Sequence, residues 1–195
     1  MSTLTRPPVQ RVPPVARPTR SWRSPVRSAL LTGAAGVAAV TTAVLVAPHV
    51  PRDPLLHDVA LLGHLTALAL GFGAVLLLDL TGARWMLGRV TLADTARLAA
   101  LAHPAIWLGM AGLVLTGGLL HPDPTSVLTQ GKLLAVVVAC ANGGYATSLG
   151  HEVATAAARA PHLPRGLLLR GLVASGVSQG AWWTAVVVGW LNARS

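Results

Sequence analysis

Residues 59–80 read VALLGHLTALALGFGAVLLLDL and carry one charged side chain, Asp79, close to their end. A helix of about 20 apolar residues crosses the roughly 30 Å hydrocarbon core of a bilayer. A helix on the surface of a soluble protein would instead show a polar stripe along the side that faces water. Residues 59–80 show no such stripe and therefore predict a membrane-spanning helix.

Other stretches of the chain share this apolar character and have a similar length: residues 28–48, 98–120, 133–150 and 171–191. Hydrophobic residues make up 53% of the chain and charged residues only 11%. A soluble domain carries about twice that share of charge. The sequence thus predicts an all-α protein, a polytopic membrane helix bundle with five transmembrane helices.

Basic residues lie mainly on one side of these stretches. Six arginines precede residue 28, three lie between residues 80 and 98, and three lie between residues 150 and 171. The other side holds only Arg52, Lys132 and Arg194. Short basic loops stay in the cytoplasm, so we expect a plasma-membrane protein with its N-terminus cytoplasmic and its C-terminus outside.

The net charge of +9 raises the question of nucleic acid as a partner. The basic residues flank the predicted spans and are scattered over short loops. This distribution favours the lipid bilayer, with its anionic headgroups, as the partner, and disfavours nucleic acid.

Residues 1–27 differ from the rest, because prolines alternate there with arginine, valine and threonine. Such a segment buries too little apolar surface to offset its conformational entropy, which predicts a disordered cytoplasmic tail before a membrane domain at 28–195. We interpret the first apolar stretch as an uncleaved anchor, because Leu45, Ala47 and Pro48 form a poor signal-peptide cleavage pattern. Cys140 is the only cysteine and lies inside a predicted span, so neither a disulfide nor a thiol metal site is expected.

The loops between the stretches are short, which predicts an up-and-down bundle whose successive helices are antiparallel neighbours. Gly176 and Gly180 form a GxxxG pair in the last stretch. Glycine lets helix backbones approach closely in lipid. We therefore expect this face to contact another helix, within the bundle or in a homo- or hetero-oligomer. On this view Gly180→Leu disrupts packing more than Gly33→Leu does.

Polar side chains inside the spans are expensive in hydrocarbon and mark the places where function can reside. Asn142 and Gln179 lie near the middle of the fourth and fifth stretches, where hydrogen bonds between helices are one interpretation. Asp79 and Arg84 are interpreted as an ion pair at the membrane boundary. No catalytic residue is identified.

Two histidines, His64 and His103, also fall within spans. A buried imidazole can hydrogen-bond a neighbour, relay protons or ligate haem iron. Two haem ligands must lie on facing helices at similar depth, and the spans place His64 and His103 at different depths. His103 with His151 is the better inner pair, and His64 with His121 or His57 is the outer one, but neither pair is well matched in depth.

Residues 61–151 resemble the small membrane proteins of the copper-resistance D-type superfamily and the HemJ-type protoporphyrinogen oxidases. The segments that carry the resemblance are GHLTALALGFGAVLLLDLTGARW, HPAIWLGMAGLVLTGGLL and GKLLAVVVACANGGYATSLGH, in which His64, Pro104 and Lys132 match the shared positions. The resemblance implies a redox protein that binds haem b, with His64 as one axial ligand.

The resemblance is incomplete at the second axial ligand. HemJ-type proteins have a histidine there, where this chain has Asn142 followed by two glycines. His103 or His151 would then have to supply the second ligand.

Two classes of function follow from the sequence. One is a haem-binding or redox membrane protein. The other is a non-enzymatic bundle that serves as a transport component or assembly partner. The sequence contains no nucleotide-binding, zinc-protease or hydrolase motif that would support an additional class.

The charge distribution generates a topology prediction. Reporter fusions after residues 27, 90, 126, 160 and 195 should report inside, inside, outside, inside and outside in turn, because the basic segments remain cytoplasmic. Alkaline phosphatase and a fluorescent protein that matures only in the cytoplasm would provide the measurement. A phosphatase that is active after residue 90 would contradict the predicted orientation.

Overall fold

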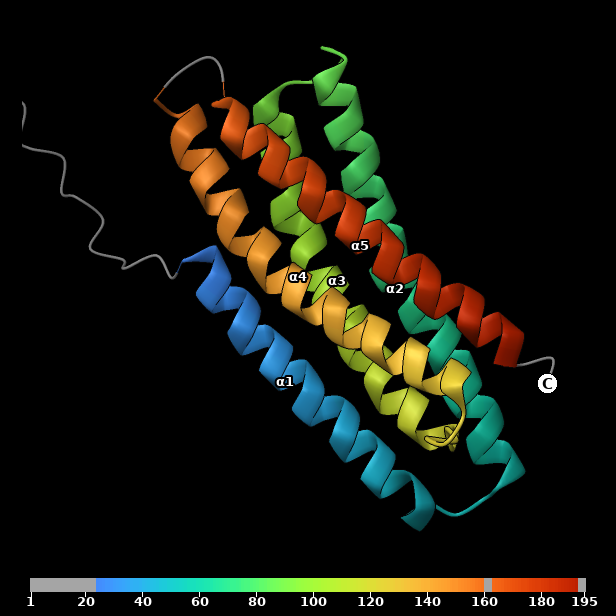
Figure 1. Cartoon of the computed structure of the whole chain (residues 1–195). Coiled ribbons are helices and arrows are strands. Elements are labelled where there is room, and N and C mark those ends of the chain that lie inside the picture. Colours follow the sequence, from blue (N-terminus) through green and yellow to red (C-terminus); the bar gives the residue numbers. More distant parts are fainter. Residues whose placement is uncertain (1–23, 160–162, 193–195) are drawn as a thin grey trace, which may run out of the picture.

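A computed structural model describes residues 24–159 and 163–192, and in these ranges the chain is α-helical throughout apart from short connections (Figure 1). The elements are α1 (Pro25–Val46), the 3₁₀ turn η1 (Ala47–His49), α2 (Pro54–Met86), α3 (Leu92–Leu119), α4 (Val127–Ala157) and α5 (Arg165–Asn192). No strand occurs in the described ranges, which confirms the all-α prediction.

The first helix begins earlier than predicted, at Pro25, so the last residues of the expected tail are helical. Residues 1–23, which hold the rest of that predicted tail, lie outside the described ranges.

Helix starts coincide with the prolines and capping residues of the sequence. The Ser24 side chain accepts a hydrogen bond from the backbone N–H of Arg27, and the next residue is proline. Asp53 caps α2 in the same way before Pro54. Proline suits the first turn of a helix because the N–H that it lacks would have no partner there.

Four helices, α1 to α4, are long and apolar enough to cross a membrane, as a multi-pass membrane protein requires. Their outward side chains are apolar too: Leu62, Leu101 and Leu115 are 68%, 76% and 70% exposed. Helices of a soluble protein would present polar side chains there. The fifth helix, α5, has the length of a span but is not among these four.

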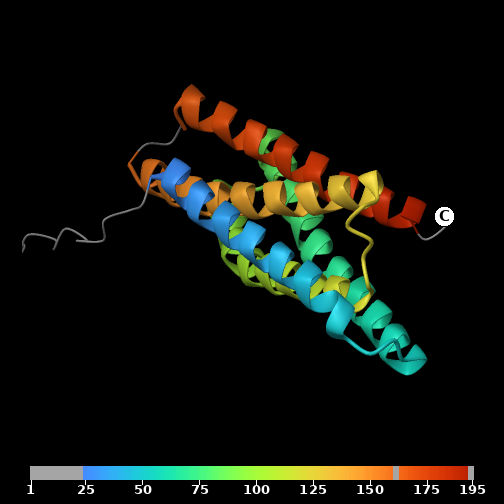
Figure 2. The ribbon, with the colours of Figure 1, turned by 60° about the horizontal axis from the view of Figure 1, so that its bottom comes forward.

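The helices run roughly along one common direction, and consecutive connections lie at opposite ends of the bundle (Figures 1 and 2). We call the end with the α2–α3 connection, residues 87–91, the inner end, and the end with the α3–α4 connection, residues 120–126, the outer end. These names follow the predicted orientation.

Helix neighbours differ in part from the expected order. The pairs α2–α3 and α4–α5 are successive in the chain and pack closely, whereas α1 packs mainly on α4 and not on α2. Small residues explain this pairing: a Cβ at Gly36 would lie 2.9 Å from Cβ of Cys140, and one at Gly144 would meet Thr32 and the carbonyl of Ser28. Close approach of small residues therefore outweighs the short α1–α2 connection.

The tightest crossing joins α2 to α3. A Cβ added to Gly109 would lie 2.5 Å from Cα of Gly71 and 2.7 Å from the carbonyl oxygen of Ala67. One turn further along α3, Gly112 lies against Ala67. The two backbones thus touch, which only glycine at position 109 permits.

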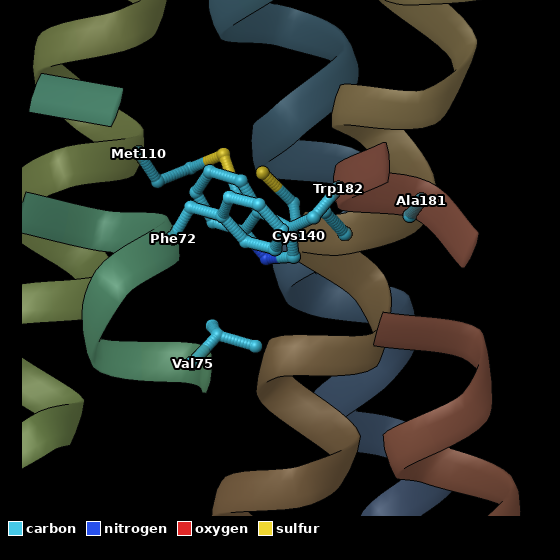
Figure 3. Packing of buried hydrophobic residues seen from close by; sticks show 7 residues of the cluster. Phe72, Val75, Met110, Cys140, Ala181 and Trp182 are labelled. Carbon is cyan, nitrogen blue, oxygen red and sulfur yellow. The ribbon is translucent and has the colours of Figure 1, made fainter. Parts of the chain in front are cut away.

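A small apolar cluster lies where the helices meet (Figure 3). Phe72 of α2 stacks on Trp182 of α5, with ring centroids 5.6 Å apart, and meets Trp183 edge-on at 5.1 Å. Met110 of α3 and Cys140 of α4 complete the cluster from the other side. Trp182 is therefore a packing residue of the bundle centre.

The Gly176–Gly180 face does not take part in this packing. A Cβ at either glycine would have nothing within 4 Å, whereas one at Gly33 would lie 3.2 Å from Cβ of Ala141. The expected order of Gly180→Leu and Gly33→Leu is therefore wrong for the single chain. Helix α5 turns a different face, with Ala174, Ala181 and Trp182, toward the bundle.

The glycine crossing predicts a large effect of a very small substitution. Gly109→Ala should lower the free energy of unfolding by about 2 kcal/mol, because the methyl group forces α2 and α3 apart. Gly73→Ala is the matched control: its surroundings are open, and alanine should stabilise the helix there by up to about 1 kcal/mol. Unfolding in mixed detergent followed by circular dichroism would measure both. Equal stabilities would contradict the assigned α2–α3 contact.

Candidate functional site

His64 lies in the outer half of α2 and is bonded to α3. Its Nδ1 is 2.9 Å from the hydroxyl oxygen of Thr116, and that hydroxyl is 2.6 Å from the carbonyl oxygen of Gly112. A carbonyl only accepts, so the Thr116 hydroxyl donates to Gly112 and accepts the proton of His64 Nδ1. The Nε2 atom is then unprotonated and carries a lone pair.

His103 lies in the inner half of α3 and is bonded within its own helix. Its Nδ1 is 2.8 Å from the carbonyl oxygen of Ala99, so Nδ1 carries the proton and Nε2 again has a lone pair. Pro104 follows directly and has no N–H. The helix nevertheless continues without interruption from Leu92 to Leu119.

The two in-span histidines are not brought together. His64 contacts Thr116, and Thr116 is 13 residues from His103 along α3. At a rise of about 1.5 Å per residue, this separation is about 20 Å. Over that distance the two imidazoles cannot ligate the same iron together.

The other histidines lie near the helix ends. His151 is in the inner part of α4, where Gly143, two turns closer to the middle, lies against the ring of Trp107. His103 is one turn from Trp107 in the same inward direction, so His103 and His151 are closer in depth than His103 and His64. His121 donates from Nε2 to the carbonyl oxygen of Val50, 3.1 Å away, and thereby joins the two outer connections.

Asp79 forms a polar cluster between α2 and α5. The Ser175 hydroxyl donates to Oδ1 at 2.9 Å, and the Gln179 amide nitrogen donates to Oδ2 at 2.6 Å. The indole N–H of Trp183 donates to the other end of the Gln179 amide, at 3.0 Å. The expected ion pair with Arg84 is wrong, because the carboxylate bonds to Ser175 and Gln179 of α5.

Two further links attach α5 to α4. The Asn142 amide donates to the backbone carbonyl of Ala174 at 2.9 Å. At the inner end, Arg170 donates to the Tyr145 hydroxyl at 2.9 Å and to the Glu152 carboxylate at 2.8 Å. The interpretation of Asn142 and Gln179 as links between helices is thus confirmed. The partners Ser175 and Trp183 were not identified, although Ser175, Gln179 and Trp183 share one helix face through their spacing of four residues.

Asp79 differs from the other acidic residues in how the free-energy cost of its charge is offset. A carboxylate inside a span costs free energy to insert, up to about 3 kcal/mol at the middle of the helix and less toward its ends. Hydrogen bonds to a charged acceptor offset part of this cost. Glu152 has Arg170 as an ion partner and Asp94 has Arg97. In the part of the chain that the structure describes, Asp79 has neutral donors only.

A shallow cavity of about 360 Å³ opens at the outer end between the start of α2 and the end of α3. Arg52, Asp53, His57 and His121 contribute its polar side chains. In the neighbouring connection, the backbone N–H and hydroxyl of Thr125 donate to Asp123, which lowers the pKa of that carboxyl below its usual value. Among the described residues, no three His, Cys, Asp or Glu side chains are grouped as a metal ion would require.

The sequence and the fold were compared with known proteins. No family model, no curated protein and no solved structure matches this chain. The resemblance to the copper-resistance D-type and HemJ-type proteins therefore stays a prediction.

Proposed function

We propose that this chain is a five-span protein of the plasma membrane, cytoplasmic at its N-terminus, that acts without enzymatic chemistry as an assembly partner or transport component. The observation that carries the proposal is that polar groups inside the spans bond to neighbouring helices. Asp79 and Asn142 bond to α5, and His64 bonds to α3. Polar groups placed in this way hold helices together.

The fifth span is part of this proposal. Helix α5 runs for 28 residues, which is about 42 Å at a helical rise of about 1.5 Å per residue. Ser175 and Gln179 bond to Asp79 of α2, and Arg170 bonds to Tyr145 and Glu152 of α4, so the free-energy cost of placing these polar groups in the bilayer is reduced. This arrangement supports α5 as a membrane span that depends on its neighbours.

The open face of α5 suggests how the protein associates. Gly176 and Gly180 are exposed and have open space around them. A second α5 can approach such a face closely enough for van der Waals contact between backbones. We propose that this face joins two copies of the chain.

Energy transfer between labelled copies in lipid vesicles tests the association. Gly180→Leu should reduce the dimer population about tenfold, because the leucine side chain separates the backbones. Gly73→Leu is the matched control, since Gly73 is also open but lies on α2. Energy transfer that is equal in Gly180→Leu and wild-type protein would exclude this face, and its absence at every protein density would exclude self-association.

The second proposed function is haem binding, which the state of His64 favours. Its Nδ1–H is fixed by Thr116, and its Nε2 has the lone pair that an iron ligand needs. The residues do not fit a haem held by His64 and His103 together, because about 20 Å separates them along α3. A haem b in this protein would have His64 as its protein ligand, and it would supply redox chemistry.

An absorption spectrum tests the haem proposal. Protein purified after expression with added haem should show a Soret band that shifts on reduction, and His64→Ala should abolish it. Thr116→Val should weaken haem binding by about tenfold, because the imidazole loses its orienting partner. His103→Ala should leave the band unchanged. A colourless wild-type preparation would exclude the haem proposal and leave the non-enzymatic proposal intact.

A further inference from the structure

Asp79 and His103 lie at the same depth on two helices that touch. The α2–α3 contacts pair His64 with Thr116 and Gly71 with Gly109, which sets the register of the two antiparallel helices. In this register Asp79 is level with residue 101, so His103 is within about 3 Å of it along the bundle axis.

Both side chains also project from the bundle-facing sides of their helices. Phe72 and Met110 belong to the buried cluster (Figure 3). Asp79 is seven residues from Phe72, and His103 is seven residues from Met110. Two helical turns return a residue to nearly the same face. Asp79 and His103 therefore form one polar layer, about 10 Å inward from the aromatic cluster.

The two groups have complementary proton chemistry. His103 has its proton on Nδ1, bonded to Ala99, and a lone pair on Nε2. Asp79 has two acceptor oxygens and is bonded to Ser175 and Gln179. Neither side chain bonds directly to the other in the described structure, so a proton would pass between them through water or by side-chain rotation.

A metal cation fits this layer less well than a proton does. Cations such as calcium need six or more oxygen ligands. The Gln179 oxygen is turned away, because the Trp183 N–H can only donate and therefore fixes the amide with its nitrogen toward Asp79. Both carboxylate oxygens already receive hydrogen bonds. The Asp79 carboxylate and Nε2 of His103 therefore remain able to accept and release a proton.

The charged groups on the surrounding helices have other partners or lie outside this layer. Arg170 of α5 is bonded to Tyr145 and Glu152 of α4 at the inner end. Arg97 of α3 is 3.9 Å from Asp94. Arg84 lies five residues beyond Asp79 on α2, toward the inner end. The other titratable groups within the helices include His64 and Lys132 in the outer half, Cys140 in the apolar cluster, and His151 in the inner part of α4.

We propose that Asp79 and His103 form a proton-binding site in the inner half of the bundle, where one exchangeable proton resides on the carboxylate or on Nε2 of the imidazole. The proton comes from the inner aqueous side, and no electron is transferred. Ser175 accommodates both states: it donates to the charged carboxylate, and it can rotate to bond its own helix and accept from the protonated acid. This site goes beyond the proposed function, because it names the proton as the ion that a transport component would carry.

Infrared difference spectroscopy of the full-length protein in lipid vesicles tests the site. Between about pH 8 and pH 5, where imidazole titrates and solvated carboxylates remain ionised, the wild type should show either a carboxylic C=O band or an imidazolium band. Asp79→Asn should remove the first, and His103→Gln should reduce the second by the share of one of the seven histidines. In each variant, the titration midpoint of the remaining group should shift by about one pH unit or more.

His49→Gln is the matched control, because His49 also bonds the carbonyl four residues before it, that of Leu45, but lies exposed at the outer end. It should leave the carboxylic band and the midpoints of Asp79 and His103 unchanged. Ser175→Ala keeps both titratable groups and should shift the midpoint even where Asp79→Asn fails to fold. The proposal is overturned if neither substitution changes the bands, or if the midpoint of each group does not respond to the partner residue.

Discussion

The structure depends on one constraint: inside a bilayer no water is available to bond a polar group, so each group must find its partner within the protein. The backbone meets this constraint by forming helices throughout the described ranges. The few polar side chains meet it by bonding across helix interfaces, as Asn142 does with the backbone of Ala174. The same scarcity of polar groups makes each in-span titratable residue informative.

Two kinds of contact hold the helices of the bundle together. Glycines bring α1 onto α4 and α2 onto α3, since a side chain at Gly36 or Gly109 would collide with the neighbouring helix. Hydrogen bonds attach α5, the least apolar of the helices, through Asp79 on α2 and Asn142 on α4. Close packing of small residues thus dominates between the apolar helices, where His64–Thr116 is an added polar link, whereas polar links and the Phe72–Trp182 stack hold α5.

The histidines illustrate how depth separates roles that the sequence groups together. His64 and His103 have the same tautomer, with Nδ1 bonded and Nε2 open, yet they lie in opposite halves of the bundle. His64 belongs to the α2–α3 contact, whereas His103 shares a layer with Asp79. A site built on these residues is therefore an outer imidazole or an inner imidazole with a carboxylate, and not a pair of imidazoles.

The sequence by itself determined the helical class, four apolar helices and the polar residues that matter, because hydrophobic length and composition are local properties of the chain. It placed the start of the first helix three residues late, since Ser24 caps a helix whose first turn, from Pro25, the apolar run alone does not reveal. Only the tertiary structure decided that α1 packs on α4, that Gly180 faces away and that Asp79 bonds Ser175 instead of Arg84. These outcomes depend on which helix faces meet and in which register, and residues far apart in the chain set both.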